Sequence, residues 1–159
     1  IKWPIAEGIG HLINLRYLDL CYNLINGSIP PEIGNLKSLV HLSLFHNNLI
    51  GPILSAVGHL INLEILDIGQ NEINGSIPPE IGNLTNLNGL ALDVNKITGP
   101  FPLILCHLTN LTDLSLSSNQ IHGSIPHELT QLTKIYFLNL SSNQLSGLIP
   151  IELFELETL

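Results

Sequence analysis

The chain is poor in the residues that usually fill and cover a globular domain. Its 159 residues include no methionine, 5% aromatic residues and 11% charged residues, against roughly 25% charged residues in an ordinary soluble domain. Hydrophobic residues nevertheless make up 45% of the chain. Leucine and isoleucine must therefore fill the core, while asparagine, serine, threonine and histidine supply most of the polar surface.

Two further shortages exclude classes of function. Basic residues number 5 against 13 acidic ones, which gives a net charge of −8. This balance argues against nucleic acid or an anionic membrane surface as a partner, because both select basic patches. No apolar run reaches the roughly 18 residues of a membrane-spanning helix. We therefore expect no membrane contact by this segment itself.

What the chain does contain is a repeat. Six asparagines stand 24 residues apart: Asn23, Asn47, Asn71, Asn95, Asn119 and Asn143. Each follows two apolar residues separated by one position, such as Leu18 and Leu20 before Asn23. A fixed period of this length indicates a repeat architecture. We predict that residues 1–159 form one solenoid array of six full units, with partial units at both ends.

The apolar pair predicts a strand, because alternate side chains of a strand point to opposite faces. The pair should face the core, and stacked units should form one parallel sheet. Each asparagine amide both donates and accepts hydrogen bonds, so it can satisfy backbone groups where the chain leaves the sheet. We predict that the six asparagines form a hydrogen-bonded ladder along the stack.

The second half of each unit is equally regular. A glycine lies four residues after every asparagine, as Gly27 does after Asn23, and a Gly-x-Ile-Pro segment recurs. We predict a short second strand from this segment and then a short helical turn that begins at Pro31, because proline suits the first helical position. Cys21 and Cys106 lie several units apart, beyond the reach of a disulfide.

The string from Asn26 to Leu36, which recurs from Asn74 to Leu84, resembles the plant-specific class of leucine-rich repeats. That resemblance implies an α/β solenoid, a right-handed superhelix with a parallel β-sheet on its concave face and short helical turns or loops on its convex face. The paired cysteine caps typical of such arrays are missing, and the chain ends within a repeat at Glu157 to Leu159. We therefore expect an internal part of a longer protein.

The same resemblance implies a function. Such arrays form the ectodomains of plant receptor-like kinases, so we expect a segment that binds a peptide or protein ligand, and a co-receptor, on the extracellular side of the plasma membrane. We expect no enzyme activity, because the motifs of a kinase domain are absent, and no cofactor. Two alternatives stay open: a secreted inhibitor of polygalacturonases, and a structural spacer between binding repeats.

The outward columns of the predicted sheet supply the candidate ligand-binding residues. An aromatic–histidine patch gathers at the N-terminal end, where aromatic residues anchor interfaces; it consists of Tyr17, Tyr22, His41, Phe45 and His46. An acidic track suits a basic ligand; it consists of Asp19, Asp67, Asp93 and Asp113.

Other site types are weaker hypotheses. His41, His46 and Cys21 do not form a recurring metal-ligand set, so we predict no metal site. Asp113 and Ser115 share one face, whereas His107 belongs to the return half, so they predict no catalytic site. Asparagine sequons mark candidate glycosylation sites: Asn26, Asn74, Asn83 and Asn110, with Asn139 on the sheet face itself, where a glycan would block binding.

Overall fold

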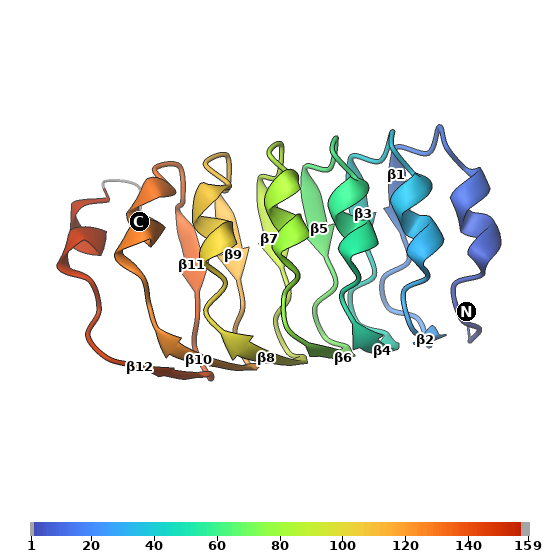
Figure 1. Ribbon diagram of the computed structural model, residues 1–159. Helices are drawn as coiled ribbons and strands as arrows, with labels where there is room; N and C mark the ends of the chain where they lie inside the picture. Colours follow the sequence, from blue (N-terminus) through green and yellow to red (C-terminus); the bar gives the residue numbers. More distant parts are fainter. Residues whose placement is uncertain (1, 157–159) are drawn as a thin grey trace.

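The computed structural model describes residues 2–156, which form a stack of similar coils. Ile1 and residues 157–159, where the sequence is expected to stop within a repeat, lie outside the described part. The coils follow one another in chain order from one end of the stack to the other (Figure 1). The predicted solenoid is therefore confirmed.

Every full coil begins with a strand of the first sheet, which is parallel and has the order β1-β3-β5-β7-β9-β11. These strands are β1 (Tyr17–Asp19), β3 (His41–Ser43), β5 (Ile65–Asp67), β7 (Gly89–Ala91), β9 (Asp113–Ser115) and β11 (Phe137–Asn139). Their register pairs residues one period apart, so that Leu18 lies opposite Leu42. The outward columns expected from the sequence are therefore continuous rows across the sheet.

A second parallel sheet follows, with the order β12-β10-β8-β6-β4-β2. Its strands are β2 (Asn26–Gly27), β4 (Asn48–Pro52), β6 (Glu72–Gly75), β8 (Lys96–Pro100), β10 (Gln120–Ser124) and β12 (Gln144–Ser146). Five of them end at the glycine or one residue beyond it, and β12 ends one residue before Gly147. All six therefore precede the Ile-Pro pair that was predicted to belong to them. Glycine takes a positive φ here, 75° at Gly75, which turns the chain out of the extended conformation.

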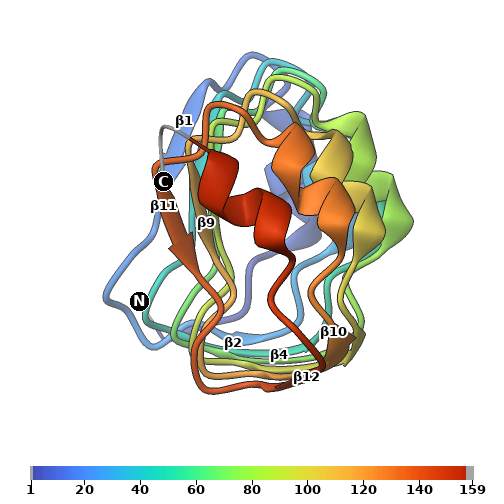
Figure 2. The same ribbon diagram turned by 90° about the vertical axis from the view of Figure 1, so that its left-hand side faces the viewer.

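The helical turns are 3-10 helices. They are η1 (Glu7–His11), η2 (Pro31–Asn35), η3 (Ser55–His59), η4 (Pro79–Asn83), η5 (Leu103–His107), η6 (His127–Gln131) and η7 (Ile151–Glu155). Pro31 and Pro79 occupy first positions, as predicted, because a proline there gives up no needed N–H. The view along the stack in Figure 2 places the first sheet, the second sheet and the 3-10 helices on three different sides of the coil.

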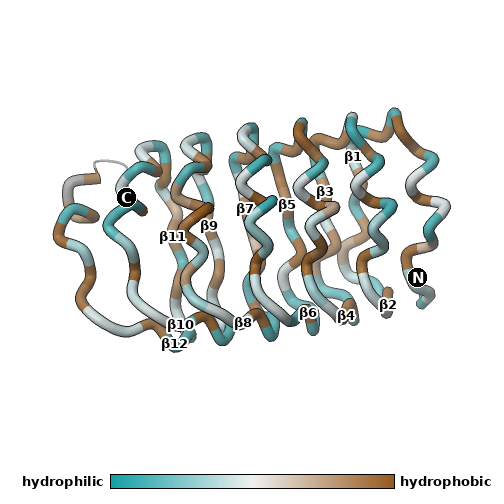
Figure 3. The backbone as a smooth tube through the Cα atoms, in the orientation of Figure 1, coloured by the Kyte–Doolittle hydropathy of each residue, from teal (hydrophilic) through white to brown (hydrophobic). Residues whose placement is uncertain are grey.

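Leucine and isoleucine from all three sides meet in one continuous core. In coil two, for example, Leu42 of the first sheet, Leu44 just after it and Leu49 of the second sheet are fully buried. Figure 3 shows hydrophobic and hydrophilic positions alternating along the coils. The period therefore repeats the same dry interior from coil to coil, which is how a repeat array builds a core from units too small to have one alone.

One feature of the backbone has no counterpart in the sequence analysis. The residue before each ladder asparagine is left-handed, with φ between 50° and 54°: Tyr22, His46, Gln70, Val94, Ser118 and Ser142. This conformation is uncommon without glycine and unfavourable for a β-branched residue. The side chains of these six residues therefore do not follow the pleat of the first sheet, and their column lies at the rim of the sheet.

Candidate functional site

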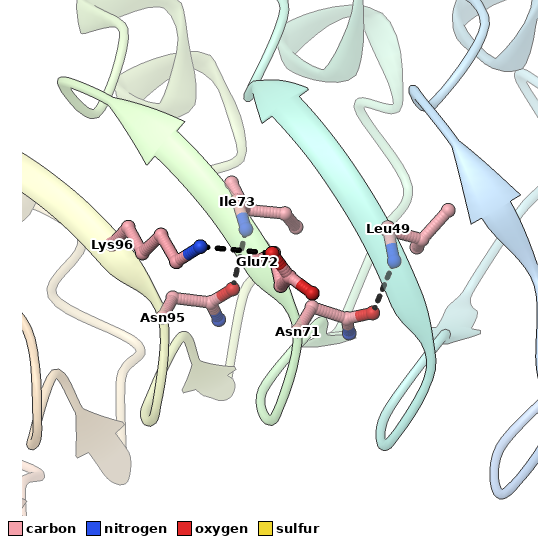
Figure 4. Close-up of polar contacts among 6 residues, drawn as sticks. All are labelled: Leu49, Asn71, Glu72, Ile73, Asn95 and Lys96. Atoms are coloured by element: carbon pink, nitrogen blue, oxygen red, sulfur yellow. Dashed lines mark hydrogen bonds and ion pairs between the residues drawn. The ribbon is translucent and has the colours of Figure 1, made fainter.

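The asparagine column lies where each coil leaves the first sheet. Asn71 is representative: its Oδ1 accepts the N–H of Leu49 at 3.0 Å, and its Nδ2 donates to the carbonyls of Leu44, Ile68 and Gly69 at 3.0 to 3.1 Å. Leu44 and Leu49 belong to the preceding coil. Figure 4 shows Asn71 and Asn95 making the equivalent bonds in successive coils.

The contacts of this column differ in one way from the predicted ladder. Asn47, Asn95, Asn119 and Asn143 repeat the pattern of Asn71. None of these hydrogen bonds joins one amide to another: each of the five amides bonds to backbone groups of its own coil and of the coil before it. The reason is that the backbone groups at the turn would otherwise stay unpaired in the interior. The ladder therefore runs alternately through amides and backbone.

A second asparagine column was missed. The side chains of Asn62, Asn86 and Asn110 donate to carbonyls of the preceding coil, those of Lys37, Ile61 and Thr85, at 2.7 to 3.0 Å. The signal was in the sequence, because these three asparagines also stand 24 residues apart. Asn62 and Asn86 are exposed and Asn110 is half-buried, and all three hold the loops that lead into the first sheet.

The aromatic–histidine patch divides into two groups. Tyr17 and His41 lie side by side in one column, with ring centroids 6.4 Å apart. Beyond the opposite ends of these strands, Tyr22 packs edge-on against Phe45, with ring centroids 5.4 Å apart, and tilted against His46, with centroids 5.1 Å apart. Tyr22 is 73% exposed and Tyr17 is 65% exposed. Both groups present a ring to solvent, as predicted. They form two separate clusters of rings and not one continuous aromatic–histidine patch.

Between the two groups lies a polar contact that the sequence did not reveal. The Cys21 thiol lies 2.7 Å from Asp19 Oδ1 and 2.9 Å from Ser43 Oγ. Hydrogen bonds from the Cys21 thiol and from its N–H lower the pKa of the Asp19 carboxyl, while burial and Asp19 raise the pKa of the thiol. Ser43 was expected to face solvent, yet only 4% of it is exposed. This end of the acidic track is therefore occupied by internal contacts.

The other three acidic residues meet around a hollow in the middle of the first sheet, which we call the acidic hollow. Its volume is about 510 Å³. Asp67, Asp93 and Asp113 line it, together with Ile65, Leu66, Gly89, Leu90, Ala91, Ser115, Ser117, Phe137 and Asn139. The acidic track is thus split, since Asp19 does not belong to this group.

The charges in the acidic hollow influence one another. Asp67 Oδ1 accepts the N–H of Gly69 at 3.1 Å, and a Cβ placed on Gly69 would lie 3.0 Å from Asp93 Oδ1. The two carboxylates therefore flank Gly69. Burial raises the pKa of the Asp67 carboxyl; the Gly69 N–H opposes this, and the charge of Asp93 adds to it. A carboxylate with a raised pKa gains from a nearby cation.

Comparison with protein families agrees with this architecture. Leucine-rich repeat models match most of the chain in three stretches: a two-copy model at residues 13–57, one repeat at 62–84, and a further leucine-rich repeat model at 85–145. The chain belongs to the leucine-rich repeat family. The fold class predicted from the sequence is therefore confirmed.

Relatives of this leucine-rich repeat array are plant proteins. TMV resistance protein N of Nicotiana glutinosa is 54% identical over 46 residues, which are 28% of this chain and 4% of that protein. The plant peptide hormone receptor RGFR1, solved in complex with RGF2, is 36% identical with a TM-score of 0.96. The Arabidopsis receptor kinase HAESA, solved with the peptide hormone IDA and the co-receptor SERK1, is 36% identical with a TM-score of 0.95.

The two structural matches cover 99% of this chain but only 25% and 26% of the solved receptor chains. The chain also spans only 4% of the length of the resistance protein that it matches. The resemblance to receptor-kinase ectodomains is thus confirmed for a short run of repeats.

The weaker site hypotheses concern residues that the leucine-rich repeat array keeps apart. His107 ends η5, on a different side of the coil from Asp113 and Ser115 in β9 (Figure 2). Within residues 2–156, no three His, Cys, Asp or Glu side chains are placed to hold a metal ion. Cys21 and Cys106 are both free thiols. No helix in the described part of the chain is long and apolar enough to cross a membrane.

The glycosylation candidates lie in different surroundings. Asn26 in β2, Asn74 in β6 and Asn83 at the end of η4 are exposed. Asn110 is half-buried, and its amide both donates to the Thr85 carbonyl and accepts from Lys134. Asn139 lines the acidic hollow. The first three therefore offer accessible amides away from the first sheet.

Proposed function

We propose that this array is a ligand-recognition segment of a plant cell-surface receptor and binds a peptide or protein on the exposed face of its first sheet. The observation that carries the proposal is the acidic hollow, a depression of about 510 Å³ in a sheet that is otherwise closely paired. Ligand sites combine a concave, partly apolar surface with a few polar groups that fix orientation. The hollow has both.

The aromatic–histidine patch supports the same face as the binding surface. Tyr17 and Tyr22 of the first coil are exposed, and the half-buried Phe45 follows β3, the strand that pairs with β5 of the hollow. Aromatic side chains lose little conformational entropy on binding and give much contact area. An extended peptide that lies across the sheet would meet the patch at one end and the acidic hollow further along.

The similar solved structures support a peptide as the ligand. RGFR1 was solved with RGF2, and HAESA with a peptide hormone and a co-receptor. By analogy, we propose an extracellular location as part of a longer membrane protein, with a co-receptor as a second partner. The match to a resistance protein shows that leucine-rich repeats serve other roles, and a secreted inhibitor or a spacer remains the alternative that the experiment must exclude.

The test is a selection of random 12-residue peptides on the wild-type array, followed by affinity measurements on two variants. Ala91→Arg puts a long side chain in the centre of the first sheet. Asn83→Arg puts the same side chain at the exposed end of η4. We expect the selected peptides to lose at least about tenfold in affinity for Ala91→Arg and less than about twofold for Asn83→Arg.

The opposite result would overturn the proposal. Peptides that bind Ala91→Arg as well as the wild type would place recognition elsewhere on the coil. Failure to select any peptide would favour the spacer. Nitrogen–proton NMR spectra of both variants check that the array keeps its fold.

A further inference from the structure

The acidic hollow owes its shape to the composition of β7. This strand contributes Gly89 and Ala91 to the outward columns, whereas the flanking strands contribute Ile65 and Asp67 on one side and Asp113 on the other. Two small residues between longer ones leave a depression in the sheet. A Cβ at Gly89 would touch only Ile65, at 3.9 Å, so the space above β7 is open.

The hollow carries negative charge, and the one basic residue that acts on its Asp67 carboxyl is His41, on the neighbouring strand β3, which lowers the pKa of Asp67. No lysine, arginine or histidine lines it. The ion pairs found in residues 2–156 join Lys96 to Glu72 and His127 to Glu128, and neither involves the hollow. A pair of uncompensated carboxylates in a partly desolvated depression is unfavourable unless a cation joins them.

A buried hydroxyl points to a ligand independently of the charges. Ser117 lines the hollow, although only 8% of the residue is exposed. Its carbonyl accepts from Val94 and Asn119, but within the described part of the chain no contact engages its Oγ. Buried hydroxyls are normally hydrogen-bonded. The only fully buried unpaired side-chain oxygen in the described residues is Glu32 Oε2, so Ser117 Oγ is open to the depression that it lines and is available to a ligand there as donor and acceptor.

The walls suit the stem of a long side chain. Ile65 and Phe137 line opposite parts of the hollow, and both are more than one-third exposed. Basic side chains bury their methylene groups along such apolar surfaces while the charged end reaches polar groups. The aromatic face of Phe137 also favours a nearby cation.

We propose that the acidic hollow receives the guanidinium group of an arginine side chain of the peptide ligand, with Asp67 and Asp93 as acceptors and Ser117 Oγ as a further acceptor at its base. Guanidinium presents five N–H donors in a planar fork, which matches several oxygen acceptors better than the three donors of lysine do. This inference rests on the proposed function, because it names the chemistry of the ligand at the same face.

The direct test titrates the array with N-acetyl-arginine N-methylamide and follows backbone N–H shifts by NMR. We expect shifts at Gly69, Ala91 and Ser117 that saturate at roughly millimolar concentration, as for other ligands of this size. The citrulline analogue has the same shape without the charge and should bind at least about tenfold more weakly, since hydrogen bonds between charged groups are roughly twice as strong as neutral ones. The lysine analogue should fall between them.

Variants separate charge from shape. Asp67→Asn and Asp93→Asn should each weaken binding of the arginine probe by about tenfold, and Gly89→Leu should abolish it by filling the depression. Asp19→Asn is the matched control, because Asp19 occupies the same outward column as Asp67 but does not line the hollow; it should change affinity by less than about twofold. Equal binding of citrulline and arginine, or unchanged affinity of both Asp67→Asn and Asp93→Asn, would overturn the inference.

The selected peptides distinguish failure of this inference from failure of the proposed function. Each peptide is resynthesised with citrulline in place of every arginine. Peptides that need an open Ala91 but tolerate citrulline would leave the proposed function standing and remove the arginine. Peptides that ignore Ala91→Arg would remove the proposed function, whatever the small probe does.

Discussion

The first two coils and the three that follow share the same interior, but the outward faces of their first-sheet strands differ. Asn47 and Asn95 make equivalent hydrogen bonds to their own and preceding coils. On the outward face, β1 and β3 carry rings such as Tyr17 and His41, whereas β7 carries only Gly89 and Ala91. The comparison shows that the interior fixes the spacing of the coils and leaves the outward columns free to vary. Recognition can therefore change along the stack without a change of fold.

The same two regions differ on the side of the 3-10 helices. In the N-terminal coils a glycine approaches the next helix so closely that a Cβ would clash with its backbone: at Gly34 it would lie 2.6 Å from the Ala56 carbonyl oxygen. In the fourth coil the equivalent position is Cys106, which is fully buried, and the pKa of its thiol is raised to about 11, chiefly by burial. The C-terminal coils thus accommodate a side chain where the N-terminal ones do not.

The largest expected effect concerns what the two regions share. Asn71→Ala leaves the Leu49 N–H without its acceptor and three carbonyls without the Asn71 donor. Unsatisfied buried polar groups cost about 1–3 kcal/mol each, and part of this loss is relieved by water. We expect the free energy of unfolding to fall by about 3 kcal/mol, measured by urea denaturation with circular dichroism.

Asn86→Ala is the matched control for the ladder. Asn86 makes one such contact, to the Ile61 carbonyl, and its surroundings are exposed. Its loss should cost less than about 1 kcal/mol. Similar losses for Asn71→Ala and Asn86→Ala would show that the ladder asparagines have no special role in joining the coils.

The next prediction compares the close-packed glycines of the 3-10 helices with Cys106. Gly58→Ala puts a methyl group into the backbone carbonyl of Glu80, and overpacking of this kind costs about 1–3 kcal/mol. Cys106→Ala removes only a sulfur from a position that already holds a side chain, and should cost about 1 kcal/mol. Gly8→Ala, at a position with open space around it, should be neutral. Urea midpoints of the three variants provide the comparison, and equal losses for Gly8→Ala and Gly58→Ala would refute it.

A smaller, stabilising effect is expected at the rim of the first sheet. Val94 has a φ of 51°, a conformation that is unfavourable for a β-branched residue. Val94→Asn should raise the free energy of unfolding by about 1 kcal/mol, because asparagine tolerates the left-handed conformation. Ser118 has a similar φ, 53°, but no β-branch, so Ser118→Asn should change stability by less. A stability loss in Val94→Asn would show that the valine is held by contacts and not strained.

Most of the fold was predictable because it follows from one period. Once Leu18 and Leu20 are read as a core-facing pair, the 24-residue spacing places every strand, and the register of β1 with β3 follows. The second strand was less predictable: its limits depend on where the chain turns, which the positive φ of Gly75 decides. Propensity alone does not show on which side of such a glycine a strand lies.

The site was less predictable than the fold. The repeat period predicts which residues share an outward column, but the depth of the surface depends on the sizes of neighbouring side chains from different coils. Gly89 and Ala91 were not predicted as site residues, although their small side chains create the acidic hollow. Ser117 belongs to an outward column of the first sheet, yet only 8% of the residue is exposed. Asp19 and Asp67 belonged to one predicted track, but only Asp67 lines the hollow.

The smallest expected effect sets Asp19 against Asp67, which share one column of the sheet. Hydrogen bonds from Cys21 lower the pKa of Asp19. Burial raises the pKa of Asp67; the hydrogen bond from the Gly69 N–H opposes this rise, and the charge of Asp93 adds to it. Carboxyl-carbon NMR titration should therefore place the Asp67 pKa above 3.8 and the Asp19 pKa below it. Asp93→Asn should lower the Asp67 pKa and leave Asp19 unchanged.

The two shifts have opposite consequences for stability. The pKa of Asp67 is higher in the folded state than in the unfolded state, so the folded state binds the proton more tightly. The contribution of Asp67 to the free energy of unfolding therefore falls as pH rises above 3.8 and through the folded-state pKa. Asp67→Asn should then gain stability over the wild type as pH increases towards neutrality. Asp19 stabilises the fold above its unfolded pKa and loses this as pH falls through its lower folded pKa, so Asp19→Asn should lose stability at neutral pH. Parallel changes in the urea midpoints of the two variants would mean that the two regions of the first sheet do not differ electrostatically.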